Sequence, residues 1–244
     1  GFYQPGISVI LHPHDMAKKE ILTFPTAGLV YNIWFENETT LWASTVNGIE
    51  IFHFDKAKKL LQPIRKIDKK DGLPGNIIRS VYKDKQGSIW IATAFGIARM
   101  KGKNRSDYKV EKTFTDKDGL VNNYVFSALE DNKGNLWFAT AGGVSRLSRD
   151  GKAFHNYTSV SDRSDTAKNK PLVDKVMLLV SAVSEGLANQ DVRSIVMDKE
   201  GQLWFATGAG ISFYDEKNDN FKSITSKDGL SVDRLYFLQF DSLR

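Results

Sequence analysis

The sequence predicts an all-β protein: a β-propeller of four-stranded antiparallel blades, with four complete blades, partial blades at both ends and one helical insertion. The main observation is a nine-residue motif that occurs four times in register. Each copy joins two short apolar stretches through a tight turn, which is typical of neighbouring strands in a hairpin. A Gly-Leu pair precedes every copy. The copies are Leu41–Ile49, Ile89–Ile97, Leu136–Val144 and Leu203–Ile211.

Three positions of the motif are the same in all copies: a Trp, a Thr three residues later and a Gly six residues after the Trp. The tryptophans Trp42, Trp90, Trp137 and Trp204 are 48, 47 and 67 residues apart. The last interval therefore contains an insertion of about twenty residues relative to the repeat length. A large Trp beside a small Ala suits interdigitation between stacked sheets, so we expect these side chains in the core rather than on a sugar-binding surface.

The second copy shows how one blade is expected to fold. Ile77–Lys83, Ile89–Thr93 and Ile97–Met100 are apolar and β-branched and predict three strands, and the more polar Val110–Thr115 predicts a fourth. Asp84–Gly87 predicts the first turn, where Asp caps the turn and Gly accepts a positive φ. The second strand is apolar on both sides of its pleat, which indicates a sheet covered on both faces.

Two polar columns recur with the motif. Asp84, Asp131 and Asp198 are each followed three residues later by Gly, so a turn is favoured over calcium ligands, whose loop spacing is absent. The repeated threonines have no base paired with them. We therefore interpret them as hydroxyls that hold the adjacent turn rather than as nucleophiles.

The order of these features resembles a known repeat. Gly72-Leu73, the turn Asp84–Gly87 and the motif Ile89–Ile97 are similar to the two-component regulator propeller repeat. The resemblance covers roughly residues 28–241, with a shorter first copy in which Glu36–Thr39 replaces the Asp-x-x-Gly turn. It implies an extracytoplasmic sensor region of a bacterial hybrid histidine kinase or diguanylate cyclase. Such a region would be periplasmic and part of a membrane-anchored parent protein.

The repeats divide the chain into segments. They are a partial blade with third and fourth strands at 1–27, complete blades at 28–70, 71–117, 118–184 and 185–227, and the first strand of a further blade at 228–244. Either a parent protein continues on both sides, or the two ends pair to complete a fifth blade. The insertion at about 159–184 has apolar residues at helical spacing after Pro171. We interpret it as a helix packed on the propeller side, or else as a docking helix or ligand lid.

Composition narrows the function classes. The chain has 244 residues, 41% of them hydrophobic, and no Cys, which removes disulfide and thiolate chemistry. The net charge of +5 is spread over loops in which Lys and Asp are mixed, so nucleic acid is not an expected partner. The four histidines lack a carboxylate or Cys cluster, and phosphate-binding motifs are absent, so no metal, cofactor or catalytic residue is predicted. These histidines are His12, His14, His53 and His155.

The candidate binding site lies where the repeats differ, because positions shared by all copies maintain the scaffold. Seven residues after the Gly of each longer copy, the first strand carries a large side chain, and Tyr31 is equivalent in the first copy. We predict a surface at the entrances to these strands that binds an anionic or sugar-like ligand, the alternative being a solvated rim. The predicted residues are Arg79, Arg193, Phe126 and Tyr236, with Asn47, Asn76, Phe95 and Asn123 at the rim.

These features predict a sensor or interaction module that binds a small molecule, an oligosaccharide or a protein partner and is not itself an enzyme. It would pass the bound state to a signalling domain elsewhere in the parent protein, and a dimer is compatible with this role. One alternative is a propeller lyase resembling virginiamycin B lyase, although no His falls within the repeat register. The other is a structural propeller of a secretion or assembly machine.

Overall fold

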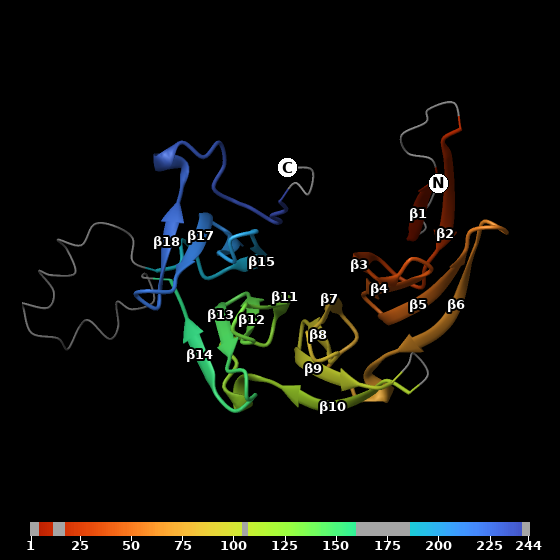
Figure 1. The fold of residues 1–244 in the computed structure, drawn as a ribbon, viewed down its shortest axis with the longest axis horizontal. Coiled ribbons are helices and arrows are strands. Elements are labelled where there is room, and N and C mark those ends of the chain that lie inside the picture. Colours follow the sequence, from red (N-terminus) through yellow and green to blue (C-terminus); the bar gives the residue numbers. More distant parts are fainter. Residues whose placement is uncertain (1–4, 12–17, 104–106, 160–185, 241–244) are drawn as a thin grey trace, which may run out of the picture. The chain divides into compact units, whose positions relative to one another are not determined.

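A computed structural model describes residues 5–11, 18–103, 107–159 and 186–240 (Figure 1). The chain separates into two units, Gly1–Thr113 and Phe114–Arg244. The helix predicted within the insertion lies outside the described residues, as do His12 and His14.

The described part of the first unit holds a two-stranded sheet and two four-stranded sheets, all antiparallel. The strands follow chain order within each sheet (Figure 1). They are β1 (Gly6–Leu11) and β2 (Glu20–Pro25); then β3 (Val30–Asn37), β4 (Thr40–Thr45), β5 (Gly48–Asp55) and β6 (Leu60–Ile67); then β7 (Ile78–Lys83), β8 (Ile89–Thr93), β9 (Gly96–Lys101) and β10 (Lys109–Phe114).

The described part of the second unit holds two more four-stranded antiparallel sheets with the same order. The predicted fold class, all-β with four-stranded antiparallel blades, is confirmed. The strands are β11 (Val125–Glu130), β12 (Leu136–Thr140), β13 (Gly143–Leu147) and β14 (Phe154–Tyr157); then β15 (Val192–Met197), β16 (Leu203–Thr207), β17 (Gly210–Asp215) and β18 (Asn220–Ile224).

The motif Thr holds the turn between the second and third strands of each blade. In the second blade the Thr93 hydroxyl donates to the Gly96 carbonyl at 2.8 Å and accepts from the Phe95 N–H at 2.9 Å. The same pair of bonds recurs at Thr45, Thr140 and Thr207. The glycine must be Gly, because its φ is +122° at Gly96. The predicted structural role of these threonines is therefore confirmed.

The repeated Asp performs two tasks. One Asp84 oxygen accepts the Ser88 N–H at 2.7 Å and so closes the predicted turn. The other accepts the indole N–H of Trp90 at 2.8 Å, a bond that the turn interpretation did not include. Asp131 and Asp198 hold Trp137 and Trp204 in the same way, each at 2.8 Å. The motif is thus a unit in which one carboxylate fixes both the turn and the buried indole.

Three short 3-10 turns, each following the fourth strand of a blade, share one capping pattern. The turns are η1 (Lys69–Asp71), η2 (Asp116–Asp118) and η4 (Ser226–Asp228). In each, the cap residue and the last turn residue bond each other's backbone, and the following Gly is left-handed. η1 leads from β6 toward β7, and η2 leads from β10 toward β11.

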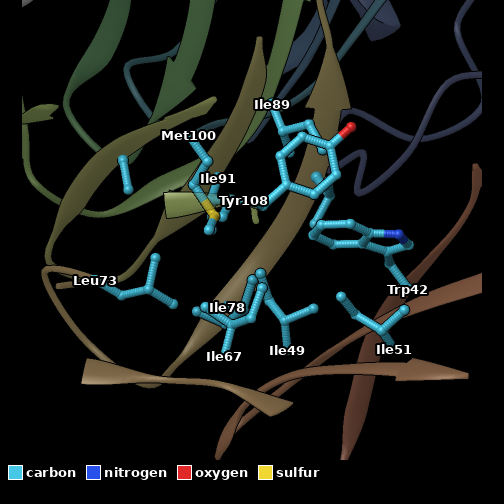
Figure 2. Packing of buried hydrophobic residues seen from close by; sticks show 12 residues of the cluster. Trp42, Ile49, Ile51, Ile67, Leu73, Ile78, Ile89, Ile91, Met100 and Tyr108 are labelled. Atoms are coloured by element: carbon cyan, nitrogen blue, oxygen red, sulfur yellow. The ribbon is translucent and has the colours of Figure 1, made fainter. Parts of the chain in front are cut away.

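The core of each unit lies between facing sheets. In the first unit Trp42 is fully buried beside Tyr108 (Figure 2), and their ring centroids lie 5.7 Å apart. The ring centroid of Trp34 lies 5.6 Å from that of Trp42. Isoleucines from both sheets surround it: Ile49, Ile51, Ile67, Ile78, Ile89 and Ile91. In the second unit Trp137 occupies the equivalent place among Tyr157, Tyr214 and Phe221.

The C-terminal part differs from the prediction in two respects. Trp42, Trp90 and Trp137 are at most 2% exposed, but Trp204 is only partly buried. Residues 235–240, predicted as a first strand, form no strand, because no described segment pairs with them as a second strand. This segment nevertheless contacts the fourth blade, because the Leu235 N–H donates to the Thr207 carbonyl at 3.0 Å. Trp204 therefore meets a single following segment, through Phe240, instead of a whole sheet.

Candidate functional site

A β-bulge lies at the same column of all four described first strands. The pairing with the second strand skips one residue in β3, β7, β11 and β15. A bulge re-aims the side chain it carries and is common beside binding sites. The skipped residues are Tyr31, Arg79, Phe126 and Arg193. The column that varies between repeats in the sequence is therefore also the column at which the backbone forms a bulge.

In the first unit this column forms a cation–π pair. The Arg79 guanidinium lies 4.0 Å from the centroid of the Tyr31 ring, and Tyr31 remains 44% exposed. Phe95 is 52% exposed in the turn between β8 and β9. Its ring lies over Gly75, where an added Cβ would come within 2.2 Å of it. Two half-exposed rings thus border the entrance to this unit's first strands.

In the second unit Arg193 lies between two rings. Its guanidinium is 4.3 Å from the Tyr236 centroid and 5.8 Å from the Phe126 centroid. The sequence analysis missed its carboxylate partner: Asp191 accepts from Arg193 Nη2 at 2.6 Å and Nε at 3.0 Å. Asp191 directly precedes β15, and its spacing of two residues from Arg193 could have revealed this pair. The hydrogen bond that Arg193 donates to Asp191 raises the pKa of Arg193 despite partial burial. The guanidinium therefore keeps its charge while two of its nitrogens are occupied internally.

The asparagines predicted at the rim serve the scaffold. The side-chain oxygen of Asn76 accepts the Lys69 N–H, and that of Asn123 accepts the Asp116 N–H, each at 2.8 Å. Both bonds hold the 3-10 turn that leads into the blade. The Asn47 amide donates to the Ala27 carbonyl at 2.8 Å. These contacts occupy the side-chain oxygens of Asn76 and Asn123 and the side-chain nitrogen of Asn47 within the scaffold.

A second polar cluster, which we call the Asp219 network, was not predicted. One oxygen of Asp219 accepts from the Tyr157 hydroxyl at 2.6 Å, the Tyr214 hydroxyl at 2.5 Å and Arg146 Nη1 at 3.0 Å. Its other oxygen lies 3.7 Å from His155 Nε2. Asp219 ends the β17–β18 turn with a φ of 48°, a conformation that Asp and Asn tolerate. Contacts from separate strands build this cluster, so no local sequence signal marks it.

The Asp219 network borders a cavity of about 450 Å³ in the second unit. The β11–β12 turn contributes Asn132 and Lys133, and the β15–β16 turn contributes Glu200 and Gln202. Lys133 pairs with Glu216 across this cavity. These turns lie where first strands end, so the cavity is at the opposite end of the blades from the bulge column.

We expect the Asp219 network to stabilise the second unit above acidic pH. Burial raises the pKa of Asp219, but hydrogen bonds from Tyr157 and Tyr214 and the neighbouring Arg146 and His155 outweigh it, so the pKa lies below 3.8. A lowered pKa means that the stabilisation is complete above the unfolded-state value and is lost as the pH falls through the folded-state value. The melting temperatures of wild type and Asp219→Asn should therefore differ at pH 7. The difference should begin to shrink only as the pH falls below about 4.

Asn tolerates the backbone conformation of Asp219, so the substitution changes the charge without straining the turn. Glu200→Gln is the control, since it removes a charge from the same cavity but none of these hydrogen bonds. A gap between wild type and Asp219→Asn that stays constant from pH 7 to pH 3 would contradict the assignment.

The described histidines lie away from the bulge column. His53 is on the third strand β5 and His155 is on the fourth strand β14, beside Asp219. Within the ranges that the structure describes, no three His, Asp or Glu side chains gather in a way that could hold a metal ion. The arrangement at the bulge column can stack rings and donate hydrogen bonds, and it pairs no described nucleophile with a base.

A protein-family model matches three of the four repeats. The model described as two component regulator propeller matches residues 72–95, 119–142 and 186–209. The chain carries two-component regulator propeller repeats. Each match begins at the Gly of a Gly-Leu pair and contains the first strand, the Asp turn and the Trp strand. The predicted resemblance is confirmed for these three repeats. A comparison with curated proteins found no match to the sequence.

Solved structures share the fold. An extracellular domain assigned to a hybrid two-component system of Bacteroides thetaiotaomicron matches with a TM-score of 0.65 and 20% identity, over 87% of this chain and 26% of that one. A second such domain, assigned to a one-component system, matches with a TM-score of 0.61 and 16% identity, over 91% and 28%. A virginiamycin B lyase from Staphylococcus aureus matches with a TM-score of 0.52 and 12% identity, over 90% and 62%.

At these identities the likeness shows a shared propeller fold. The chain spans about a quarter of the length of the two extracellular domains. No helix among the described residues is long and apolar enough to span a bilayer.

Proposed function

We propose that the chain is a ligand-sensing or interaction propeller of a bacterial signal-transduction protein, located in the periplasm of a membrane-anchored parent. The regulator propeller repeats support the signalling role, and the extracellular domains that share the fold support the location. The propeller would bind its ligand without converting it, because the bulge column offers stacking and hydrogen bonding but no paired acid and base. A signalling domain elsewhere in the parent would read the bound state.

The observation that carries the proposed site is a set of exposed aromatic rings backed by arginines. Tyr31 is 44% exposed with Arg79 on one side, and Tyr236 is 60% exposed with Arg193 on one side. An arginine stacked on a tyrosine fixes the ring and leaves its remaining surface for a partner. A flat ring beside a permanent positive charge suits a sugar ring that carries a carboxylate or sulfate, or an acidic protein surface.

We expect Tyr31→Ala and Arg79→Ala to weaken binding of an acidic oligosaccharide about ten-fold or more, since a charge-assisted contact contributes roughly 1.5–3 kcal/mol. An oligogalacturonate and a chondroitin sulfate fragment are suitable probes, with a neutral oligosaccharide for comparison, and calorimetry is the measurement. Leu60→Ala is the control, because Leu60 is 42% exposed on the outer strand β6.

Arg193 needs a separate test. Its ion pair with Asp191 is largely buried, with side chains 19% and 29% exposed, so Arg193→Ala should also lower the melting temperature. Tyr236→Ala avoids this and tests the second unit at an exposed ring. Unchanged affinity in Tyr31→Ala, Arg79→Ala and Tyr236→Ala, with the probes still binding, would place the ligand elsewhere.

A further inference from the structure

A groove of about 640 Å³ lies in the first unit between β2 and the β5–β6 hairpin (Figure 1). We call it the β2–β6 groove. Two contacts join its two sides: Lys59 Nζ pairs with a Glu20 oxygen at 2.5 Å, and the Ala27 N–H donates to Glu50 Oε1 at 3.0 Å. Its size falls in the range of small-molecule pockets. Residues that line it include Phe24, Phe52, Leu60, Pro63, Ile64 and Lys66.

The groove lies where β6 lacks a phenylalanine that other fourth strands carry. Phe52, four residues after the Gly that opens β5, pairs with Pro63. At the same position of the third and fourth blades, the fourth strand carries Phe154 and Phe221. Phe221 is 1% exposed, and its ring centroid lies 5.1 Å from that of Tyr157 on the preceding fourth strand. The smaller and exposed Pro63 therefore leaves open a space that a Phe side chain fills between blades.

The exposed positions of β6 also differ from those of the fourth strands in the other complete blades. Leu60 and Ile64 are 42% and 44% exposed. A β-bulge lies at Ile64, because the pairing with β5 skips from Arg65 to Pro63. β10, β14 and β18 carry Lys, Glu, His or Asn at their exposed positions. Exposed apolar side chains that gather beside a groove mark an interaction site.

The charges of the groove lie toward one end of its apolar lining. Leu60 begins β6, and Arg65 and Lys66 stand near the end of that strand. Two cations and one carboxylate, Glu50, line the groove, so its net charge is +1. Both Glu50 oxygens accept the Ala27 N–H, at 3.0 and 3.3 Å, which fixes this carboxylate in place. A complementary ligand has an apolar body and a negative charge at one end.

We propose that the β2–β6 groove binds an amphipathic organic anion, a small molecule with an apolar ring or chain and one carboxylate or sulfonate. The apolar body takes the place of the missing Phe side chain, between Phe24 and Ile64. The anion lies at Lys66, because the Arg65 guanidinium already has the Asp71 carboxylate 3.9 Å away. The groove is built from third and fourth strands, so the proposal does not depend on the ligand surface proposed above.

The test compares three naphthalene probes of similar shape on the 244-residue chain: 2-naphthoate, the neutral 2-naphthol and the cationic 2-naphthylmethylammonium. Nuclear magnetic resonance titration of the labelled chain measures the affinities and locates the shifted amides. We expect 2-naphthoate to bind about ten-fold more tightly than 2-naphthol, because it adds a charge-assisted contact to the same apolar burial. The shifts should concentrate in β2 and β6.

Matched variants locate the site. Pro63→Phe supplies the side chain that the third and fourth blades carry, so it should abolish naphthoate binding. Ile64→Asp at an exposed position should also abolish it, with circular dichroism and melting as in wild type. Lys66→Glu should weaken naphthoate binding at least ten-fold and favour the ammonium probe. Lys109→Glu makes the same charge change at an exposed position of β10 and should leave binding unchanged.

Three results would overturn the proposal. The first is naphthoate that does not bind, or binds no more tightly than the ammonium probe. The second is wild-type affinity in Ile64→Asp, or equal affinity in Lys66→Glu and Lys109→Glu. The third is a dimer of the chain, seen by sedimentation and dissociated by Ile64→Asp, which would make a second copy the occupant of the groove.

Discussion

Trp137→Ala is expected to lower the free energy of unfolding by about 3–5 kcal/mol, the range for deleting a large buried aromatic side chain. Trp137 is fully buried, and its ring contacts Tyr214 at 4.7 Å and Tyr157 at 5.7 Å between centroids. Its indole N–H also bonds Asp131 at 2.8 Å. The substitution removes packing between two neighbouring sheets and leaves a carboxylate without one of its donors.

The measurement is denaturant unfolding followed by far-ultraviolet circular dichroism. Trp204→Ala is the internal control, since Trp204 has the same motif position and the same bond to its Asp but is only partly buried. Its loss should be clearly smaller. Equal losses at the two positions would show that local strand geometry, rather than packing between sheets, determines the contribution of the motif Trp.

Asp84→Ala is expected to lower the free energy of unfolding by roughly 3 kcal/mol, because it removes two charge-assisted hydrogen bonds of a buried carboxylate. Asp84 is 7% exposed and accepts from both the Ser88 N–H and the Trp90 indole. After the substitution the indole N–H is left buried without this acceptor. Thermal and denaturant unfolding measure the loss.

Two related variants separate the contributions. Asp84→Asn keeps one acceptor oxygen and should lose less than Asp84→Ala. Asp198→Ala removes the same pair of bonds at a partly exposed site, so its loss should also be smaller. A surface-like effect for Asp84→Ala, below about 0.5 kcal/mol, would contradict the role assigned to the carboxylate.

The repeat pattern predicted most of the blade architecture, because its signals are local. The strand expected at Ile89–Thr93 has those bounds in the structure, and the one expected at Ile97–Met100 forms β9 at Gly96–Lys101. The hydroxyl of Thr93 and the turn at Asp84 act over three or four residues. Such contacts repeat whenever the residues repeat.

The candidate site was less predictable. Variation between repeats identified the column of Arg79 and Arg193, but the bulge that presents it depends on pairing between strands. Asp191, which occupies two of the Arg193 nitrogens, was overlooked although it is only two residues away. Asn76 and Asn123 were predicted at the rim, and the structure adds that their side-chain oxygens hold the preceding turns.

The sequence by itself determined the repeat and the strands and turns of each blade, because these follow from side-chain pattern and short-range bonding. Only the tertiary structure decided which face of each sheet is covered. It left Trp204 partly exposed although Trp42, Trp90 and Trp137 are buried. It also brought Asp219 together with Arg146, Tyr157 and Tyr214 from separate strands. The physical reason is that burial and long-range hydrogen bonding depend on the neighbouring sheet, and a blade's own residues do not encode that neighbour.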